Sequence, residues 1–196
     1  MNSGDKTMDK AERKPVAWIA VVGLVVGILA LAWYFAPGSG GTGGATSSGL
    51  RQAPEIGLKD AKGAVHKLGE MKGASLVLVH FWAHWCPPCL EEIPRFAAFA
   101  KHPQAADYRL IAVSEDPSWE EAHKSLPSEG HAPNFVSVLD QDSKVSEIYG
   151  TYQYPETYAV RVREGRAEIL MKWVGPQNWE SPEFLATLER LAANQK

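Results

Sequence analysis

Two cysteines, Cys86 and Cys89, are the residues of this chain that are best suited to covalent chemistry, and they are its only cysteines. Their C-x-x-C spacing separates them by about one turn of a helix, so the two sulfur atoms can meet. Such a pair can form a disulfide and exchange it with a disulfide of another molecule. Because the two sulfurs themselves carry the electrons, we expect no cofactor and no metal.

Other uses of the pair remain open but fit the sequence less well. Half of a zinc site would need further ligands, and the six histidines are scattered along the chain. Attachment of c-type haem needs a histidine directly after the second cysteine, where this chain has Leu90. An inert structural disulfide is the third alternative, although so short a loop would constrain the chain little.

The surrounding pattern predicts that the cysteines lie where a buried strand is followed by a helix. Residues 75–82 are almost all apolar and several are β-branched, as in a strand that is buried on both faces. Residues 88–101 have helical spacing, with Leu90, Ile93, Phe96 and Ala97 on one face. Cys86 would then lie at the helix N-terminus, where free N–H groups and the helix dipole stabilise a thiolate.

The next residues suit such a helix start, and the rest of the chain predicts an α/β domain with a mixed sheet. Pro87 and Pro88 fit a first helical turn, where a missing N–H costs little. Strand and helix patterns alternate after the cysteines and end in a hairpin, which is typical of a mixed sheet flanked by helices. The predicted strands cover 56–59, 64–68, 108–114, 135–139, 158–162 and 167–173, and further helices cover 118–126, 143–149 and 183–193.

The stretch FWAHWCPPC, residues 81–89, resembles the active-site segment of the thioredoxin superfamily. LEEIP at 90–94, the long segment 115–149 and the Pro-Glu-Thr-aromatic motif within 149–158 make the chain similar to the membrane-anchored TlpA/ResA/DsbE branch. The resemblance covers most of residues 53–193. It implies a thioredoxin fold with an N-terminal hairpin and a central α/β insertion, and thiol–disulfide oxidoreductase activity.

The resemblance also assigns residues that would contact a substrate. Pro155 matches the proline whose cis bond faces the cysteine pair, so the Tyr154–Pro155 bond is expected to be cis. The backbone of Tyr154 would pair with an extended substrate by strand addition. A tyrosine is bulkier than the residue expected before this proline, so it either narrows the substrate range or only packs. Trp85, Pro87 and Pro88 would border the site.

Two further residues join the cysteines as candidate catalytic groups. His80 stands where thioredoxins carry a buried acid that assists proton transfer with the second cysteine; it could serve similarly or be an ordinary core histidine. Glu92 matches a glutamate that this branch carries near the dithiol. A carboxylate there would raise the pKa values of the thiols and make the pair less oxidising. The implied catalytic set is Cys86, Cys89, Glu92 and His80.

The N-terminal part of the chain predicts a membrane anchor. Residues 16–36 contain no charge and are long enough for one transmembrane helix. The tail 1–15 carries the flanking Lys and Arg residues and is expected in the cytoplasm. A Gly/Ser-rich linker, 37–49, would connect the anchor to a single domain, 50–196. A cleaved signal peptide is the alternative, but its apolar region would be shorter.

The net charge of −3 argues against a nucleic-acid partner, which would need a clustered excess of Lys and Arg.

From the anchor, the cysteine pair and the resemblance together, we expect a single-pass inner-membrane protein whose domain faces the periplasm and reduces specific protein disulfides, for example in cytochrome c or oxidase assembly. Its partners would be disulfide-containing target proteins and a membrane electron-donor protein, since no third cysteine recharges the pair. The alternatives are a haem- or metal-handling chaperone on the same fold, or an oxidant that forms disulfides.

Overall fold

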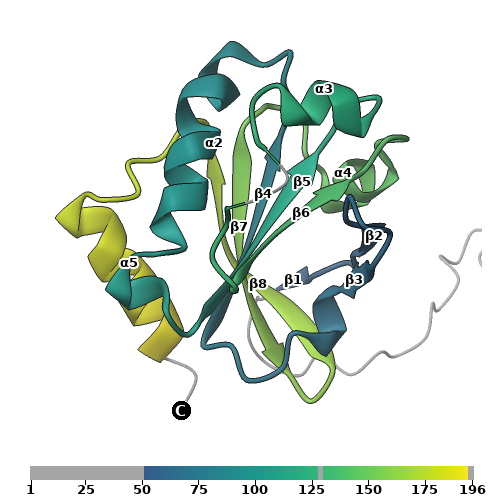
Figure 1. Ribbon diagram of the computed structural model, residues 1–196. Coiled ribbons are helices and arrows are strands. Elements are labelled where there is room, and N and C mark those ends of the chain that lie inside the picture. Colours follow the sequence, from purple (N-terminus) through teal and green to yellow (C-terminus); the bar gives the residue numbers. More distant parts are fainter. Residues whose placement is uncertain (1–50, 128–129, 194–196) are drawn as a thin grey trace, which may run out of the picture. The chain divides into compact units, whose positions relative to one another are not determined.

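The computed structural model describes residues 51–127 and 130–193 (Figure 1), which all fall within one compact unit. The predicted tail 1–15, anchor 16–36 and linker 37–49 lie outside the described residues. Within 51–127 and 130–193, no helix combines the length and the apolar character that a membrane crossing requires.

A single mixed sheet forms the centre of the described part of the chain. Its eight strands are β1 (Arg51–Gln52), β2 (Gly57–Lys59), β3 (Val65–Lys67), β4 (Leu76–Trp82), β5 (Tyr108–Ser114), β6 (Phe135–Leu139), β7 (Glu156–Arg163) and β8 (Arg166–Val174). Their order across the sheet is β1-β8-β7-β4-β5-β6-β2-β3. Strands β4, β5 and β6 are parallel, and the remaining neighbours are antiparallel. The predicted mixed α/β architecture is therefore confirmed.

Helices cover both faces of this sheet. They are α2 (Pro87–Phe99), α3 (Trp119–His123), α4 (Lys144–Tyr149) and α5 (Pro182–Ala193), with 3-10 turns at η1 (Leu68–Glu70) and η2 (Pro103–Ala105). Leu76 and Leu78 of β4 pack in one buried cluster with α2 and α5, whereas Val77 and Val79 pack in another with α4. Figure 1 shows α2 and α5 together on one side of the sheet and α4 on the other.

Strand β4 is the element that positions the cysteines. All seven of its residues are buried, as its apolar and β-branched sequence predicts. It pairs with β5 in parallel and with β7 in antiparallel orientation, so it lies inside the sheet. Helix α2 begins five residues after its last residue, Trp82, and the cysteines therefore lie beyond the carboxyl end of a central strand.

The N-terminal hairpin and the segment between β5 and β7 also form as predicted. Strands β2 and β3 pair across a turn in which Asp60 Oδ1 accepts hydrogen bonds from the backbone N–H groups of Lys62 and Ala64. The segment that follows Ser114 contains α3, β6 and α4. The hairpin joins the sheet through Lys59, which pairs with Leu139 of β6.

Besides shifts of one or two residues at the ends of other elements and two short 3-10 turns, three sequence-based expectations differ from the structure. Strand β1 was not predicted, because two residues show no alternation. Helix α3 ends at His123 rather than 126, because Pro127 has no N–H that could donate to the His123 carbonyl and continue the helix. In α2, Leu90 is exposed and Glu92 is buried, so the prediction that Leu90 belongs to the buried apolar face is wrong. Glu92 can be buried because distant backbone and side-chain groups donate hydrogen bonds to it.

Candidate active site

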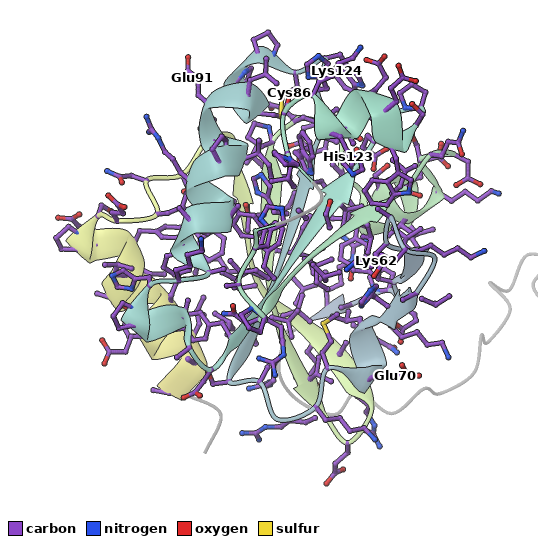
Figure 2. All side chains as sticks on the ribbon, viewed as in Figure 1. Lys62, Glu70, Cys86, Glu91, His123 and Lys124 are labelled. Carbon is purple, nitrogen blue, oxygen red and sulfur yellow. A yellow bond between two sulfur atoms is a disulfide. The ribbon has the colours of Figure 1, made fainter. Side chains whose placement is uncertain are left out.

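Cys86 and Cys89 form a disulfide at the N-terminal end of α2, with their Cα atoms 5.3 Å apart. Figure 2 shows Cys86 at the start of α2, with Lys124 from the end of α3 at the same end of the molecule in this view. Cys86 is 4% exposed and Cys89 is 0% exposed. Cys86 is therefore the cysteine that another molecule can reach first.

The sulfur of Cys86 acts as the N-cap of α2. Its Sγ accepts a hydrogen bond from the Cys89 backbone N–H at 3.3 Å. Pro87 and Pro88 occupy the first turn, as predicted, and both are exposed. An N–H donor and the positive end of the helix dipole both stabilise negative charge at this point. Reduction of the disulfide would thus favour a thiolate on Cys86.

A buried carboxylate holds the loop that leads into the cysteines. Asp116 accepts hydrogen bonds from the His84 backbone N–H at 2.9 and 3.1 Å and from Ser114 Oγ at 2.8 Å. Asp116 follows β5, and its side chain therefore fastens the turn after β4 to the neighbouring strand end. The role of Asp116 could not be predicted from the sequence, because an acid after a strand is also typical of an exposed loop.

The Tyr154–Pro155 peptide bond is cis, which confirms the expectation from the resemblance. Pro155 is buried, and Tyr154 packs against the buried cluster that contains both cysteines. Trp85 is 59% exposed, and its ring meets the ring of Tyr154 edge to face with centroids 5.4 Å apart. The structure thus brings Trp85, Tyr154 and Pro155 together at the cysteine end of the molecule. Burial raises the pKa of Tyr154 to about 12.

Glu92 is buried one helical turn after Cys89, whereas its neighbour Glu91 points away from the outer surface of α2 (Figure 2). Glu92 Oε1 accepts hydrogen bonds from the Gln177 backbone N–H at 2.8 Å and from Trp179 Nε1 at 2.9 Å. Its Oε2 has no partner among the described residues. Burial raises the pKa of Glu92 to about 7, although these hydrogen bonds act in the opposite direction.

His80 is fully buried in β4 beneath α2. Its Nδ1 shares a hydrogen bond with Thr157 Oγ1 at 2.9 Å, and its ring stacks on Phe96 with centroids 4.6 Å apart. Nε2 has no partner among the described residues. Burial lowers the pKa of His80 to about 3, so the imidazole is neutral near pH 7. Trp179 lies next to both His80 and Glu92.

Another buried carboxyl group, that of Glu115, lies on the Tyr154 side of the site. Glu115 Oε2 accepts a hydrogen bond from Ser146 Oγ at 3.1 Å, and burial together with the nearby Asp140 raises the pKa of Glu115. Asp140 itself accepts hydrogen bonds from the first N–H groups of α4. Within residues 51–127 and 130–193, no group of three or more His, Cys, Asp or Glu side chains is placed to hold a metal ion.

Comparisons with known proteins agree with the fold and with the cysteine pair. The AhpC/TSA family model matches residues 50–164. Thiol-disulfide oxidoreductase ResA of Bacillus subtilis is 33% identical over 108 residues, which cover 55% of this chain and 59% of ResA. The chain thus spans less than two-thirds of that relative.

Two longer matches extend this similarity. The thiol:disulfide interchange protein DsbE homologue of Paracoccus denitrificans is 31% identical over 146 residues, which cover 73% of this chain and 76% of that protein. The crystal structure of a thiol:disulfide interchange protein DsbE from Chlorobium tepidum matches with a TM-score of 0.58 and 26% identity, over 74% of this chain and 95% of that one. The similarity to ResA and DsbE that the motifs predict is confirmed.

Proposed function

This chain belongs to the AhpC/TSA family, and from that membership and the site geometry we propose that it is a thiol–disulfide oxidoreductase that reduces specific protein disulfides. The observation that carries the proposal is the Cys86–Cys89 disulfide at the start of α2, with the more exposed sulfur on the cysteine that caps the helix. The names of the similar proteins ResA and DsbE support the same chemistry.

The reaction begins from the dithiol form. The Cys86 thiolate attacks one sulfur of a target disulfide and forms a mixed disulfide, while the other target sulfur leaves as a thiolate. Cys89 then loses its proton and attacks the sulfur of Cys86. This step releases the second target sulfur and regenerates the Cys86–Cys89 disulfide. Two electrons have passed to the target, and an external dithiol must return two electrons to the pair.

Glu92 is the better candidate for the base that removes the proton of Cys89. Burial brings the pKa of Glu92 to about 7, so the carboxyl group exchanges protons near neutral pH. Burial lowers the pKa of His80 to about 3, so this imidazole is a weak base at the same pH. His80 is then a neutral, hydrogen-bonded residue beneath the dithiol. It is a weaker candidate than Glu92 for the base.

Glu92 also favours reduction over oxidation as the direction of the reaction. A carboxylate one turn from Cys89 disfavours thiolates, and stabilisation of the thiolate form is what makes a dithiol pair strongly oxidising. A reduction potential near thioredoxin's, about −270 mV, would support this direction, and one near about −120 mV would favour the oxidant alternative.

We infer further that the protein is tethered to the inner membrane, with the domain in the periplasm. The charge-free run 16–36 and the basic tail 1–15 support this inference. An alkaline phosphatase fused after residue 196 should be active if the domain lies in the periplasm, and a cytosolic reporter at the same point should not. The electron donor would be a membrane protein, and the targets would be cysteine pairs that receive haem or copper.

Trapping of a mixed disulfide tests the proposed function. The Cys89→Ser variant of the full chain cannot resolve the mixed disulfide, so it should accumulate covalent complexes with its targets that disappear on reduction. Cys86→Ser, the matched control, should form none and should lose all disulfide reductase activity. Retained activity of Cys86→Ser would contradict the assignment of the nucleophile. Tight binding of zinc or copper without turnover would instead support the chaperone alternative.

A further inference from the structure

We propose that Trp179 is a positioning residue for the dithiol, because its indole N–H fixes the carboxyl group of Glu92 one helical turn from Cys89. The inference rests on the proposed function insofar as Glu92 accepts the proton of Cys89. Trp179 lies in the segment between β8 and α5, and no sequence motif of the cysteine region points to it.

The Trp179 ring is held firmly by its neighbours. It is 1% exposed and packs against Phe96 and Phe99 of α2, with centroids 4.8 and 5.5 Å away, and against Phe184 of α5 at 5.0 Å. A buried indole N–H requires an acceptor, and here the acceptor is Glu92 Oε1. The direction of the N–H is therefore set by the core packing, and the position of the carboxyl oxygen follows from it.

The backbone around Trp179 reinforces this contact and connects it to the cis proline. The Gln177 N–H donates to the same Oε1, and the Gln177 side-chain amide donates to the Gly175 carbonyl at 2.8 Å. The Gly175 N–H in turn donates to the Pro155 carbonyl at 2.8 Å. Gly175 has a φ of +84°, which favours glycine. One short segment, 175–179, thus links Glu92 of α2 to the cis proline, Pro155.

The arrangement leaves one carboxyl oxygen available for chemistry. Both donors reach Oε1, and the buried Oε2 has no partner among the described residues. Burial of an oxygen atom without a hydrogen-bond partner costs free energy. A purely structural role of Glu92 therefore accounts for Oε1 but not for Oε2. In the disulfide form Cys89 carries no proton, whereas in the dithiol form it offers one on the same face of the helix. Oε2 is then the atom that can accept it.

The charges around Glu92 determine the direction of the expected effect. Arg95 of α2 and the two hydrogen bonds favour the carboxylate, and burial opposes them more strongly. From β4, the facing group is His80, which burial keeps neutral. From the segment 175–179 only uncharged groups, Gln177 and Trp179, reach the carboxyl. Loss of the indole N–H removes one stabiliser of the charged form, so the pKa of Glu92 should rise.

A carboxyl titration of the full chain in detergent tests the role of Trp179. With ¹³C-labelled glutamate, the Glu92 signal of the oxidised protein should titrate about one pH unit higher in Trp179→Phe, the difference between a hydrogen bond to a charged and to a neutral carboxyl. Trp173→Phe is the matched control, because Trp173 also packs against Phe184, whereas the hydrogen bonds to Glu92 come from Gln177 and Trp179. The titration midpoint of Glu92 should not move in Trp173→Phe. An unchanged midpoint in Trp179→Phe, with or without a lower melting temperature, would overturn the proposal.

A second measurement links the contact to the dithiol. In the pH profile of disulfide reduction, the acid limb should shift to higher pH in Trp179→Phe, by the same amount as the Glu92 titration. Trp179→Phe should cause no such shift in a protein that already carries Glu92→Gln. If Trp179→Phe does not fold, replacement of the indole by benzothiophene removes only the N–H donor. Should the unsubstituted protein reduce no protein disulfide, the proposed function fails, while the carboxyl titration still decides the role of Trp179.

Discussion

The ring of Trp85 packs edge to face on the ring of Tyr154, with centroids 5.4 Å apart. Trp85 directly precedes the first cysteine and is mostly exposed, whereas Tyr154 directly precedes the cis proline and is half-buried. Two segments that are distant in sequence therefore present one aromatic surface beside the disulfide. A protein that approaches Cys86 from this side would contact this surface, which makes it the first candidate for selection among targets.

Removal of the Tyr154 ring should broaden the range of substrates. Tyr154→Ser deletes half of the aromatic pair and opens space beside the cysteines, so reduction of insulin, a bulky disulfide substrate, should become severalfold faster. Reduction of a small aromatic disulfide should change less than twofold, because it needs no such space. Tyr152→Ser is the control, since Tyr152 is 76% exposed and its ring contacts Lys172. Equal effects of Tyr154→Ser on both substrates would contradict a role in selection.

Asp116→Ala should destabilise the protein by about 3 kcal/mol, because it leaves the half-buried His84 N–H and the buried Ser114 hydroxyl without their acceptor. The loop before Cys86 should loosen at the same time, and alkylation of the reduced cysteines should become faster. Chemical denaturation and alkylation rates measure the two effects. Glu120→Ala, which removes an exposed acid on α3, should change neither. A denaturation midpoint of Asp116→Ala equal to that of the unsubstituted protein would contradict this account.

Local patterns were sufficient to predict the elements around the cysteines. The apolar run that forms β4 and the helical spacing that forms α2 are properties of neighbouring residues, so they can be read from the sequence. The cis bond before Pro155 could not be obtained in this way. Few X-Pro bonds are cis, and only the resemblance to a known family indicated this one.

Contacts between distant residues could not be predicted from the sequence alone. The periodicity of α2 gives no reason to bury Glu92, because the donors that stabilise it come from the segment after β8, more than 80 residues later. Asp116 and His84 are separated in the same way by the helix between their strands. Such pairs depend on strand order and on packing between helices, and a single sequence does not record either.

His80 should make the protein sensitive to acid. Burial lowers the pKa of His80 to about 3 from an ordinary value of 6.5, so between these pH values the unfolded chain takes up a proton that the folded protein does not. The contribution of His80 to stability is therefore complete above pH 6.5 and decreases as the pH falls, by roughly 4 kcal/mol by pH 3. Equilibrium denaturation across this range should show that the free energy of unfolding falls less steeply with decreasing pH in His80→Asn.

The comparison for His80 is His102→Asn. His102 is partly exposed and its side chain caps a short 3-10 turn, a position that asparagine also suits. This variant should follow the unsubstituted protein at every pH. If His80→Asn loses stability with falling pH as steeply as the unsubstituted protein, the imidazole is not held neutral, and the choice of Glu92 over His80 as the base would lose its main support.

Glu92 should have the opposite signature, a loss of stability as the pH rises. Burial raises the pKa of Glu92 from 4.5 to about 7, so between these values the unfolded chain releases a proton that the folded protein retains. The folded protein should therefore lose about 3 kcal/mol from this group on going from pH 4.5 to pH 8. Glu92→Gln keeps an oxygen acceptor for Trp179 and does not titrate, so its stability relative to the unsubstituted protein should increase across that range.

Glu91→Gln, on the exposed side of the same helix, should show no such trend. A constant difference between Glu92→Gln and the unsubstituted protein would mean that Glu92 is charged at pH 5, and it could not then serve as a base that changes its protonation near neutral pH.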